Sequence, residues 1–224
     1  MFLVIRLAVQ NFNVDGMSME PNLHNQELVL VDKWTYHFHT PARGDVVVFV
    51  APPNPTQDYI KRIIGVPGDI ITIQDTTVMV NGKALQEPYI DPRRQGNPYG
   101  AIVNRVVPPG TYFVLGDNRA GSSDSRDWGC VPAANIIGRA ALVYWPLGQD
   151  NNGFIPNVSS TFKDIPAPPA VKNTNTCPVV KSPPRASSIS STNSTLLLQA
   201  NMSLAFIPPG LLALYMRRVR RHIR

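Results

Sequence analysis

Short runs of β-branched and aromatic residues, separated by turn signals, constrain the fold of this chain more than any other feature. Pro-Gly, Asn-Gly and Gly-Asp sequences divide these runs, and between about Phe12 and Leu147 no long segment has the 3.6-residue period of a helix. The pattern predicts an all-β fold of antiparallel sheets with a barrel-like or multi-sheet core. The runs occupy residues 27–31, 45–50, 59–64, 69–73, 77–80, 111–115 and 140–145.

Asn81-Gly82 is the clearest local signal in this region. The dipeptide follows one strand-like run, and Asn-Gly favours the backbone twist that joins two antiparallel strands in a tight turn. Residues 77–85 are therefore predicted to form a β-hairpin.

The composition changes after residue 156. Residues 157–194 are rich in Pro, Ser, Thr, Asn and Ala and contain few large apolar side chains. Such a segment buries too little surface to offset the entropy lost on ordering. We therefore predict a folded domain over residues 11–156 and a disordered linker over residues 157–194.

Residues 195–224 become apolar again and end in a basic tail. Residues 196–216 carry no charge and are about long enough to span a bilayer, although two amides and a Pro-Pro-Gly sequence interrupt them. Two interpretations stay open. The segment is either a membrane helix with its basic tail in the cytoplasm, or an amphipathic tail on an anionic membrane surface. Both make membrane lipid a partner.

The first ten residues, 1–10, are apolar but too short to cross a bilayer alone, and Arg6 interrupts them. No small-residue cleavage site follows, as a secretory signal peptide would require. Three interpretations stay open: the remnant of a membrane anchor, the first strand of the domain, or an interfacial anchor.

Charge and metal-binding residue types exclude several classes of function. The net charge is +6, but much of the excess lies in the basic tail, and no basic–aromatic alternation suggests a nucleic-acid partner. The four histidines and two cysteines give no metal-ligand spacing, so no metal is expected. Cys130 and Cys177 are predicted to be unpaired, although an oxidising compartment would allow one disulfide.

A Ser-Lys pair is the remaining option for serine-based hydrolysis. No Gly-x-Ser-x-Gly elbow is present, and no histidine has the context of a Ser-His-Asp triad. Lysine acts as a base only when neutral, which requires burial without a carboxylate partner. Lys61 lies in an apolar run, whereas the other lysines lie in polar contexts. Arg62 should point to the opposite face of the strand. The ordinary alternative to a buried, functional lysine is that these two side chains lie on a solvent-exposed face of the strand.

Four sequence boxes resemble those of type I signal peptidases and occur in that family's order. Residues 16–23, Gly-Met-Ser-Met-Glu-Pro-Asn-Leu, resemble the family's Ser-Met-x-Pro-Thr-Leu box, with Asn22 in place of Thr. The similarity covers roughly residues 11–147. The other boxes are Arg-Gly-Asp-Val-Val-Val-Phe at 43–49, Tyr-Ile-Lys-Arg-Ile-Ile-Gly-Val-Pro-Gly-Asp at 59–69, and Gly-Asp-Asn-Arg-Ala-Gly-Ser-Ser-Asp-Ser-Arg-Asp-Trp-Gly at 116–129.

The resemblance implies roles for individual residues. Ser18 would be the nucleophile, and Lys61, 43 residues later, would be the general base. Ser122 matches the serine that hydrogen-bonds and orients the lysine. The Ser18 backbone N–H would hold the oxyanion. Many relatives add a hydroxyl two residues before the nucleophile, where this chain has Gly16, so another donor must replace it.

Two further groups of residues follow from the same resemblance. Two pairs of residues match structural ion pairs of the family: Asp117 with Arg62, and Asp124 with Arg126. The alternative is that these four charged side chains are solvated at the protein surface. Six positions match shallow substrate-binding pockets, for which ordinary core packing is the alternative: Phe12, Val14, Met19, Val48, Asp58 and Ile60.

The implied activity is endoproteolytic removal of signal peptides from exported preproteins. Family members cleave after small residues, commonly in an Ala-x-Ala pattern, without a metal or organic cofactor. The catalytic domain would lie on the extracytoplasmic side of the cytoplasmic membrane. The family's full N-terminal span is missing before the serine box. A late start site, a truncated product and replacement by the C-terminal segment all stay open.

Two other functions compete with this interpretation. One is an inactive, membrane-tethered β-domain that binds extended peptides. The other is a self-cleaving, repressor-like Ser-Lys protease, which usually carries a DNA-binding module, and only a short segment precedes Ser18 here. The sequence leaves the oligomeric state open.

Overall fold

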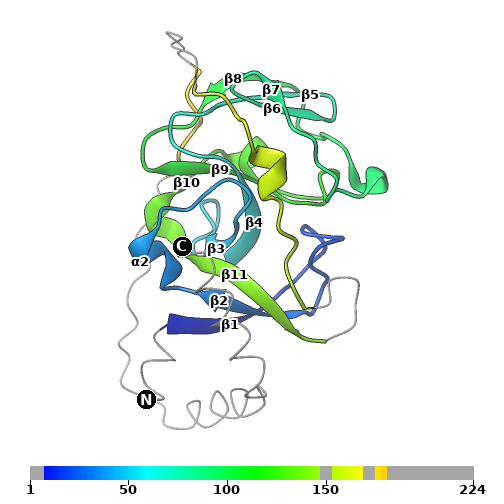
Figure 1. The fold of residues 1–224 in the computed structure, drawn as a ribbon, viewed down its shortest axis with the longest axis vertical. Helices are drawn as coiled ribbons and strands as arrows, with labels where there is room; N and C mark the ends of the chain where they lie inside the picture. Colours follow the sequence, from blue (N-terminus) through cyan, green and yellow to red (C-terminus); the bar gives the residue numbers. More distant parts are fainter. Residues whose placement is uncertain (1–7, 147–152, 169–174, 181–224) are drawn as a thin grey trace. The chain divides into compact units, whose positions relative to one another are not determined.

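The computed structural model describes residues 8–146, 153–168 and 175–180 (Figure 1). Strands dominate them, and the two α-helices, α2 (Thr35–Phe38) and α3 (Ser125–Trp128), have four residues each. The strands are β1 (Val9–Asn13), β2 (Leu28–Asp32), β3 (Val46–Val50), β4 (Asp58–Gly65), β5 (Ile70–Gln74), β6 (Thr77–Val80), β7 (Lys83–Ala84), β8 (Ile102–Val106), β9 (Thr111–Leu115), β10 (Val131–Pro132) and β11 (Ile136–Trp145). Three short 3₁₀-helices are η1 (Pro92–Arg94), η2 (Ala133–Asn135) and η3 (Ser159–Phe162).

Seven strands form one antiparallel sheet in the order β1-β2-β11-β3-β4-β9-β10. Its central strands are short apolar runs, and all five residues of β9 are buried, which explains why they read as continuous hydrophobic segments. No pairing joins the outer strands β1 and β10 among the described residues. The all-β, antiparallel prediction is therefore confirmed, whereas closure into a barrel is not seen.

The other four strands form a second antiparallel sheet in the order β7-β6-β5-β8, which lies at the opposite end of the domain from β1 (Figure 1). The predicted hairpin is confirmed here. Val80 pairs with Lys83, so Asn81 and Gly82 form a two-residue turn, and both have positive φ values, 53° and 82°. Asn-Gly tolerates this conformation, which other residue pairs rarely adopt.

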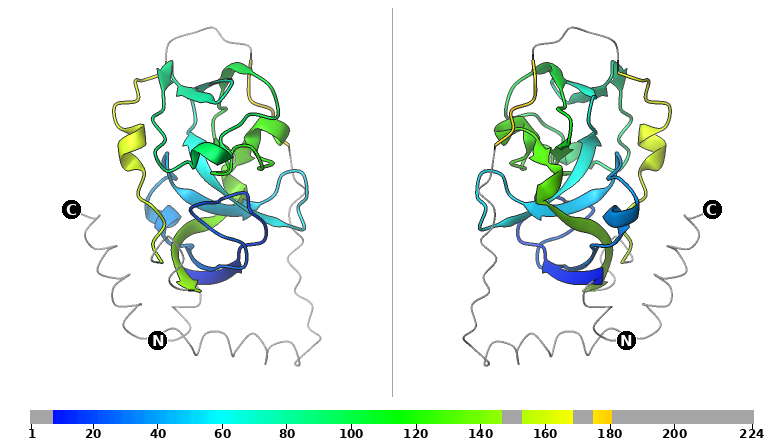
Figure 2. Two further views of the ribbon diagram at one scale, coloured as in Figure 1. Left: turned by 90° about the vertical axis from the view of Figure 1, so that its right-hand side faces the viewer. Right: turned by 90° about the vertical axis from the view of Figure 1, so that its left-hand side faces the viewer.

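Residues 153–168, after β11, pack against the rest of the domain. Val158 and Phe162 are buried in the same apolar cluster as residues of β5, β6 and β9. Figure 2 shows this segment running along the side of the domain. The linker predicted over 157–194 therefore does not begin at residue 157, because these two apolar side chains supply the burial that the surrounding polar composition concealed.

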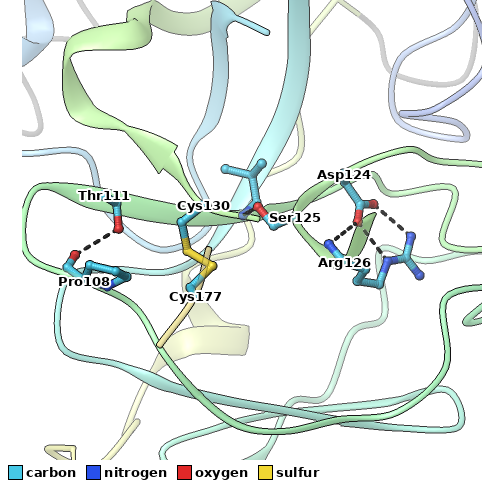
Figure 3. The surroundings of a disulfide bond; sticks show 8 residues. Pro108, Thr111, Asp124, Ser125, Arg126, Cys130 and Cys177 are labelled. Atoms are coloured by element: carbon cyan, nitrogen blue, oxygen red, sulfur yellow. Dashed lines mark hydrogen bonds and ion pairs between the residues drawn. A yellow bond between two sulfur atoms is a disulfide. The ribbon is translucent and has the colours of Figure 1, made fainter. Parts of the chain in front are cut away.

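A second part of the predicted linker, residues 175–180, connects the two sheets. Its backbone bonds to the end of β8, where the Cys177 N–H donates to Val106 O at 2.8 Å. It also bonds near β10, where the Cys130 N–H donates to Pro178 O at 2.7 Å. A disulfide joins Cys130 to Cys177, whose Cα atoms are 5.9 Å apart (Figure 3). The prediction of unpaired thiols was wrong, because sequence alone could not bring a cysteine of apparent linker composition beside β10.

Several other expectations fall partly or wholly outside the described residues. Residues 1–7, 181–194 and 195–224 are among those not described, so the anchor, the rest of the linker and the C-terminal span stay predictions. Val9 and Gln10 belong to β1, so the first strand begins inside the segment assigned to an anchor remnant. None of the helices in the described ranges has the length and apolar character needed to cross a bilayer.

The disulfide should stabilise the folded domain measurably. Closing a loop across 47 residues restricts the unfolded chain, and we expect its loss to lower the free energy of unfolding by about 2–4 kcal/mol. Urea unfolding with and without reductant would measure this. The Cys130→Ala/Cys177→Ala variant should match the reduced protein and should not respond to reductant. An unchanged wild-type midpoint in reductant would show that the bridge does not contribute.

Candidate active site

Ser18 lies in the loop between β1 and β2, and the core anchors this loop directly after the residue. Met19 and Leu23 are buried, at 1% and 0% exposed. The Asn22 and Leu23 N–H groups both donate to Met19 O at 3.0 Å, which closes a tight turn directly after the serine. The loop is therefore held by apolar packing and local hydrogen bonds, and Ser18 occupies a defined position.

Lys61 reaches Ser18 from β4. Its Nζ lies 2.8 Å from Ser18 Oγ and donates a second hydrogen bond to Ile60 O at 2.9 Å. The residue is only 4% exposed, and neighbouring Arg62 is fully buried. Both cations of this strand therefore lie inside the protein, and Arg62 turns to partners other than Ser18.

The environment of Lys61 favours the neutral amine. Burial disfavours the charged ammonium and lowers the pKa of Lys61 from 10.5 to about 8. The negative charges of Asp124 and Asp117 act in the opposite direction and raise this pKa. No ion pair joins Lys61 to a carboxylate within the described part of the chain, so desolvation outweighs the attraction of the carboxylates.

Each nearby carboxylate is instead held by an arginine. Asp117 accepts two hydrogen bonds from Arg62, at 2.8 and 2.7 Å. Asp124 accepts two from the Arg126 side chain, both at 2.8 Å (Figure 3). Both expected pairs are thus formed, and all four side chains are at most 1% exposed. Because an arginine balances each carboxylate, less negative potential reaches the Lys61 amine.

Gly116 allows Ser122 to approach the nucleophile loop. A Cβ at position 116 would lie 2.2 Å from Ser122 Oγ and 2.5 Å from Ser18 O, so no larger residue fits. The hydrogen bond expected between Ser122 and Lys61 is not formed, and Ser122 Oγ is buried without a partner among the described residues. The Lys61 amine donates to the carbonyl of its own strand instead.

The Ser18 backbone N–H, the expected oxyanion donor, has no hydrogen-bond partner among the described residues of this structure. Gly16 has a φ of +99°, and nothing lies within 4 Å of the point that a Cβ would occupy there. A hydroxyl-bearing residue would therefore have space at this position but would adopt a strained backbone. Because glycine has no side chain, position 16 supplies no hydroxyl donor beside Ser18.

Most of the expected substrate-binding residues lie in one apolar cluster. Val14, Met19 and Val48 are buried within it, and Phe12 and Ile60 pack against it with part of their surface exposed. Asp58, at the start of β4, is half-buried and is not a member of the cluster. Only Phe12, Ile60 and Asp58 therefore present substantial surface to a ligand in this structure.

Sequence reasoning missed several polar residues that support the site. Asn22 donates to both Tyr89 O and Asp117 Oδ2 at 2.9 Å, which ties the nucleophile loop to the Arg62 pair. Asn118 bonds to the peptide groups on either side of Ser18. Both residues stand inside the quoted boxes, but nothing in their loop sequences indicates which atoms they contact.

In the described ranges, no group of three His, Cys, Asp or Glu residues is arranged to hold a metal ion.

Comparison with known proteins identifies the family. Residues 1–145 match the model of the family described as signal peptidase, peptidase S26. The chain belongs to this family. The resemblance inferred from the four boxes is thereby confirmed, and membership makes the chain a peptidase.

Curated relatives of this S26 peptidase carry the same family name. Signal peptidase I of Bacillus caldolyticus is 40% identical over 156 residues, which cover 65% of this chain and 85% of the relative. Signal peptidase I of Leptolyngbya laminosa is 37% identical over 66% of this chain and 76% of its own. Signal peptidase IB of Staphylococcus aureus is 36% identical over 70% and 88%, respectively.

A solved structure also matches the S26 peptidase in part. The crystal structure of a signal peptidase I from Enterococcus faecalis V583 is 33% identical and covers 46% of this chain and 98% of that chain, with a TM-score of 0.38.

The Arg62–Asp117 pair should be essential for stability, because removing one partner leaves a buried charge without its counter-ion. We expect Arg62→Met to lower the free energy of unfolding by about 3–5 kcal/mol. Arg93→Met removes one partner of a pair whose arginine is 89% exposed, and it should change stability far less. Urea denaturation would compare them. Equal effects of both substitutions would contradict the importance assigned to burial.

Proposed function

We propose that this chain is a serine endopeptidase that removes signal peptides from exported preproteins, with Ser18 as nucleophile and Lys61 as general base. One observation carries the proposal: a buried lysine amine lies 2.8 Å from a serine hydroxyl oxygen. Burial lowers the pKa of Lys61 to about 8, so near that pH the Lys61 amine is neutral in roughly half of the protein molecules. The names of the relatives, signal peptidase I and IB, supply the substrate class.

In the proposed acylation step, neutral Lys61 takes the Ser18 hydroxyl proton while Oγ bonds to the scissile carbonyl carbon. The tetrahedral intermediate then collapses, the carbon–nitrogen bond breaks, and Lys61 returns the proton to the departing amine. In deacylation, Lys61 takes a proton from water while the water oxygen bonds to the ester carbonyl carbon. The carbon–Oγ bond then breaks, and Lys61 returns the proton to Ser18 Oγ, which restores both residues. The Ser18 N–H stabilises the oxyanion in both steps.

The supporting residues keep the amine neutral and in place. The two Arg–Asp pairs balance the carboxylates that would otherwise raise the pKa of Lys61 further. Ser122 has a buried oxygen with no partner among the described residues, beside Gly116. We propose that it accepts a hydrogen bond from Lys61 during the reaction, when the amine has gained the Ser18 proton and has one more donor to satisfy.

An extended substrate would lie along the edge of β4 that faces away from β3. Strand β9 pairs with β4 only from Arg62 to Gly65, so no strand pairs with Tyr59 and Ile60 on that edge within the described residues. A peptide there would gain main-chain hydrogen bonds and lie beside Phe12 and Ile60. Because Val14, Met19 and Val48 of this cluster are already buried, we expect the site to accept small side chains, such as those of Ala-x-Ala sites.

We place the catalytic domain on the extracytoplasmic side of the cytoplasmic membrane. The Cys130–Cys177 disulfide supports this location, since disulfides persist in oxidising compartments and are rare in the cytosol. Membrane lipid stays a proposed partner, resting on the apolar terminal segments of the sequence.

Substitution of either dyad residue should abolish cleavage of a preprotein with an Ala-x-Ala site in detergent. Ser18→Ala and Lys61→Met each remove one reacting group, and we expect kcat to fall by at least about 10³-fold. Lys83→Met is the matched control, because that half-buried lysine lies in the other sheet and bonds only to the Lys163 and Asp164 carbonyls within the described residues. If Ser18→Ala and Lys61→Met cleave at the control rate, the mechanism is wrong.

A further inference from the structure

Asn118 contacts both peptide groups that flank the nucleophile. Its backbone N–H donates to the Ser18 carbonyl oxygen at 3.0 Å, and its side-chain Nδ2 donates to the Met17 carbonyl oxygen at 3.0 Å. The residue is 7% exposed. Neither bond involves the side chain of Ser18 or Lys61, so Asn118 acts on the main chain of the loop rather than on the reacting side chains.

Gly121 determines which end of the Asn118 amide faces Met17. The Gly121 N–H donates to Asn118 Oδ1 at 3.2 Å, so this oxygen is the acceptor end of the amide. The donor end, Nδ2, must then turn toward the Met17 carbonyl. A Cβ at Gly121 would lie 3.0 Å from Nδ2, so the glycine also packs closely against the amide and restricts its movement.

Holding the Met17 carbonyl also orients the Ser18 N–H. Both groups belong to one planar peptide unit, and in a trans peptide they point in opposite directions. The cis peptides of the described chain are Glu20-Pro21 and Trp145-Pro146, so the Met17–Ser18 unit is trans. When Asn118 binds the carbonyl, the N–H therefore points away from Asn118, and it has no protein acceptor in the described residues.

We infer that Asn118 is a positioning residue that aims the Ser18 N–H at the developing oxyanion. The inference rests on the proposed acyl transfer at Ser18. It matters more in this chain than where a side-chain hydroxyl helps, because Gly16 offers no such donor. A backbone donor contributes to catalysis only if it already points to the place where negative charge develops.

The test compares Asn118→Ala and Asn118→Leu with wild type in detergent, using a peptide with an Ala-x-Ala site. Both variants lose Nδ2 but keep the backbone N–H, and Leu also keeps the volume. Because an oxyanion donor would be misdirected, we expect kcat per folded molecule to fall about 10- to 100-fold with little change in KM. The pH midpoint of the rate should stay at the wild-type value, since Lys61 is untouched.

The binding affinity of a peptide aldehyde ending in alanine gives an independent test. Its adduct with Ser18 resembles the tetrahedral intermediate, so the Asn118 variants should bind it more weakly by the factor lost in kcat/KM. Binding of the matching peptide alcohol should be unchanged. Asn175→Ala is the matched control, because it removes the same kind of amide-to-carbonyl bond, to Val103 O, and should keep the wild-type rate.

The outcomes separate this inference from the proposed function. If Ser18→Ala is inactive but the Asn118 variants retain wild-type kcat and aldehyde affinity, the positioning role is overturned while the mechanism stands. The role is equally overturned if the variants lose only thermal stability, or if the whole defect lies in KM. If Ser18→Ala still cleaves, the proposed function fails instead.

Discussion

The burial of a single amine, that of Lys61, is the constraint on which the rest of this site depends. A lysine in water is charged at neutral pH and cannot take a proton from serine. Only removal from water, without a bonded carboxylate, makes it a base. In this protein Lys61 lies in a strand whose residues from Lys61 to Gly65 are all buried, and its amine is directed at Ser18.

The surrounding charges follow from this requirement. Two carboxylates near the amine, Asp117 and Asp124, would raise its pKa, and each is bound instead by two hydrogen bonds from an arginine. The carboxylates also serve the fold, because Asp124 accepts from the Gly116 N–H and Asp117 accepts from Asn22. The loop after β9 therefore holds the Ser18 loop and the two ion pairs around Lys61 in one arrangement.

The sequence predicted the regular parts of this arrangement better than its loops. Strands β2 to β6, β9 and β11 follow from apolar, β-branched runs and turn signals. Strand β8 was missed because its central residues, Asn104 and Arg105, are polar, and Asn104 has a positive φ. The packed segment after β11 was missed because its two buried apolar residues are diluted by polar neighbours.

Of the candidate site, the sequence predicted the pair of reacting side chains but not the loop contacts that support them. Ser18 and Lys61 were predicted as a pair through the resemblance of their boxes, since a turn serine and a strand lysine are unremarkable separately, and their side chains do lie together. The Asn118 and Asn22 contacts could not be predicted, because they depend on how loops about 100 residues apart come together. Likewise, the disulfide depends on tertiary packing that no local pattern encodes.

The pH dependence of kcat/KM tests the central claim most directly. In the proposed mechanism neutral Lys61 is the active form, and burial lowers its pKa to about 8, so the rate should rise with pH through about 8 and then level off. Below that midpoint the rate should fall about tenfold for each pH unit. A profile that is flat across this range, or that rises only near the pKa of an ordinary lysine, would contradict the account.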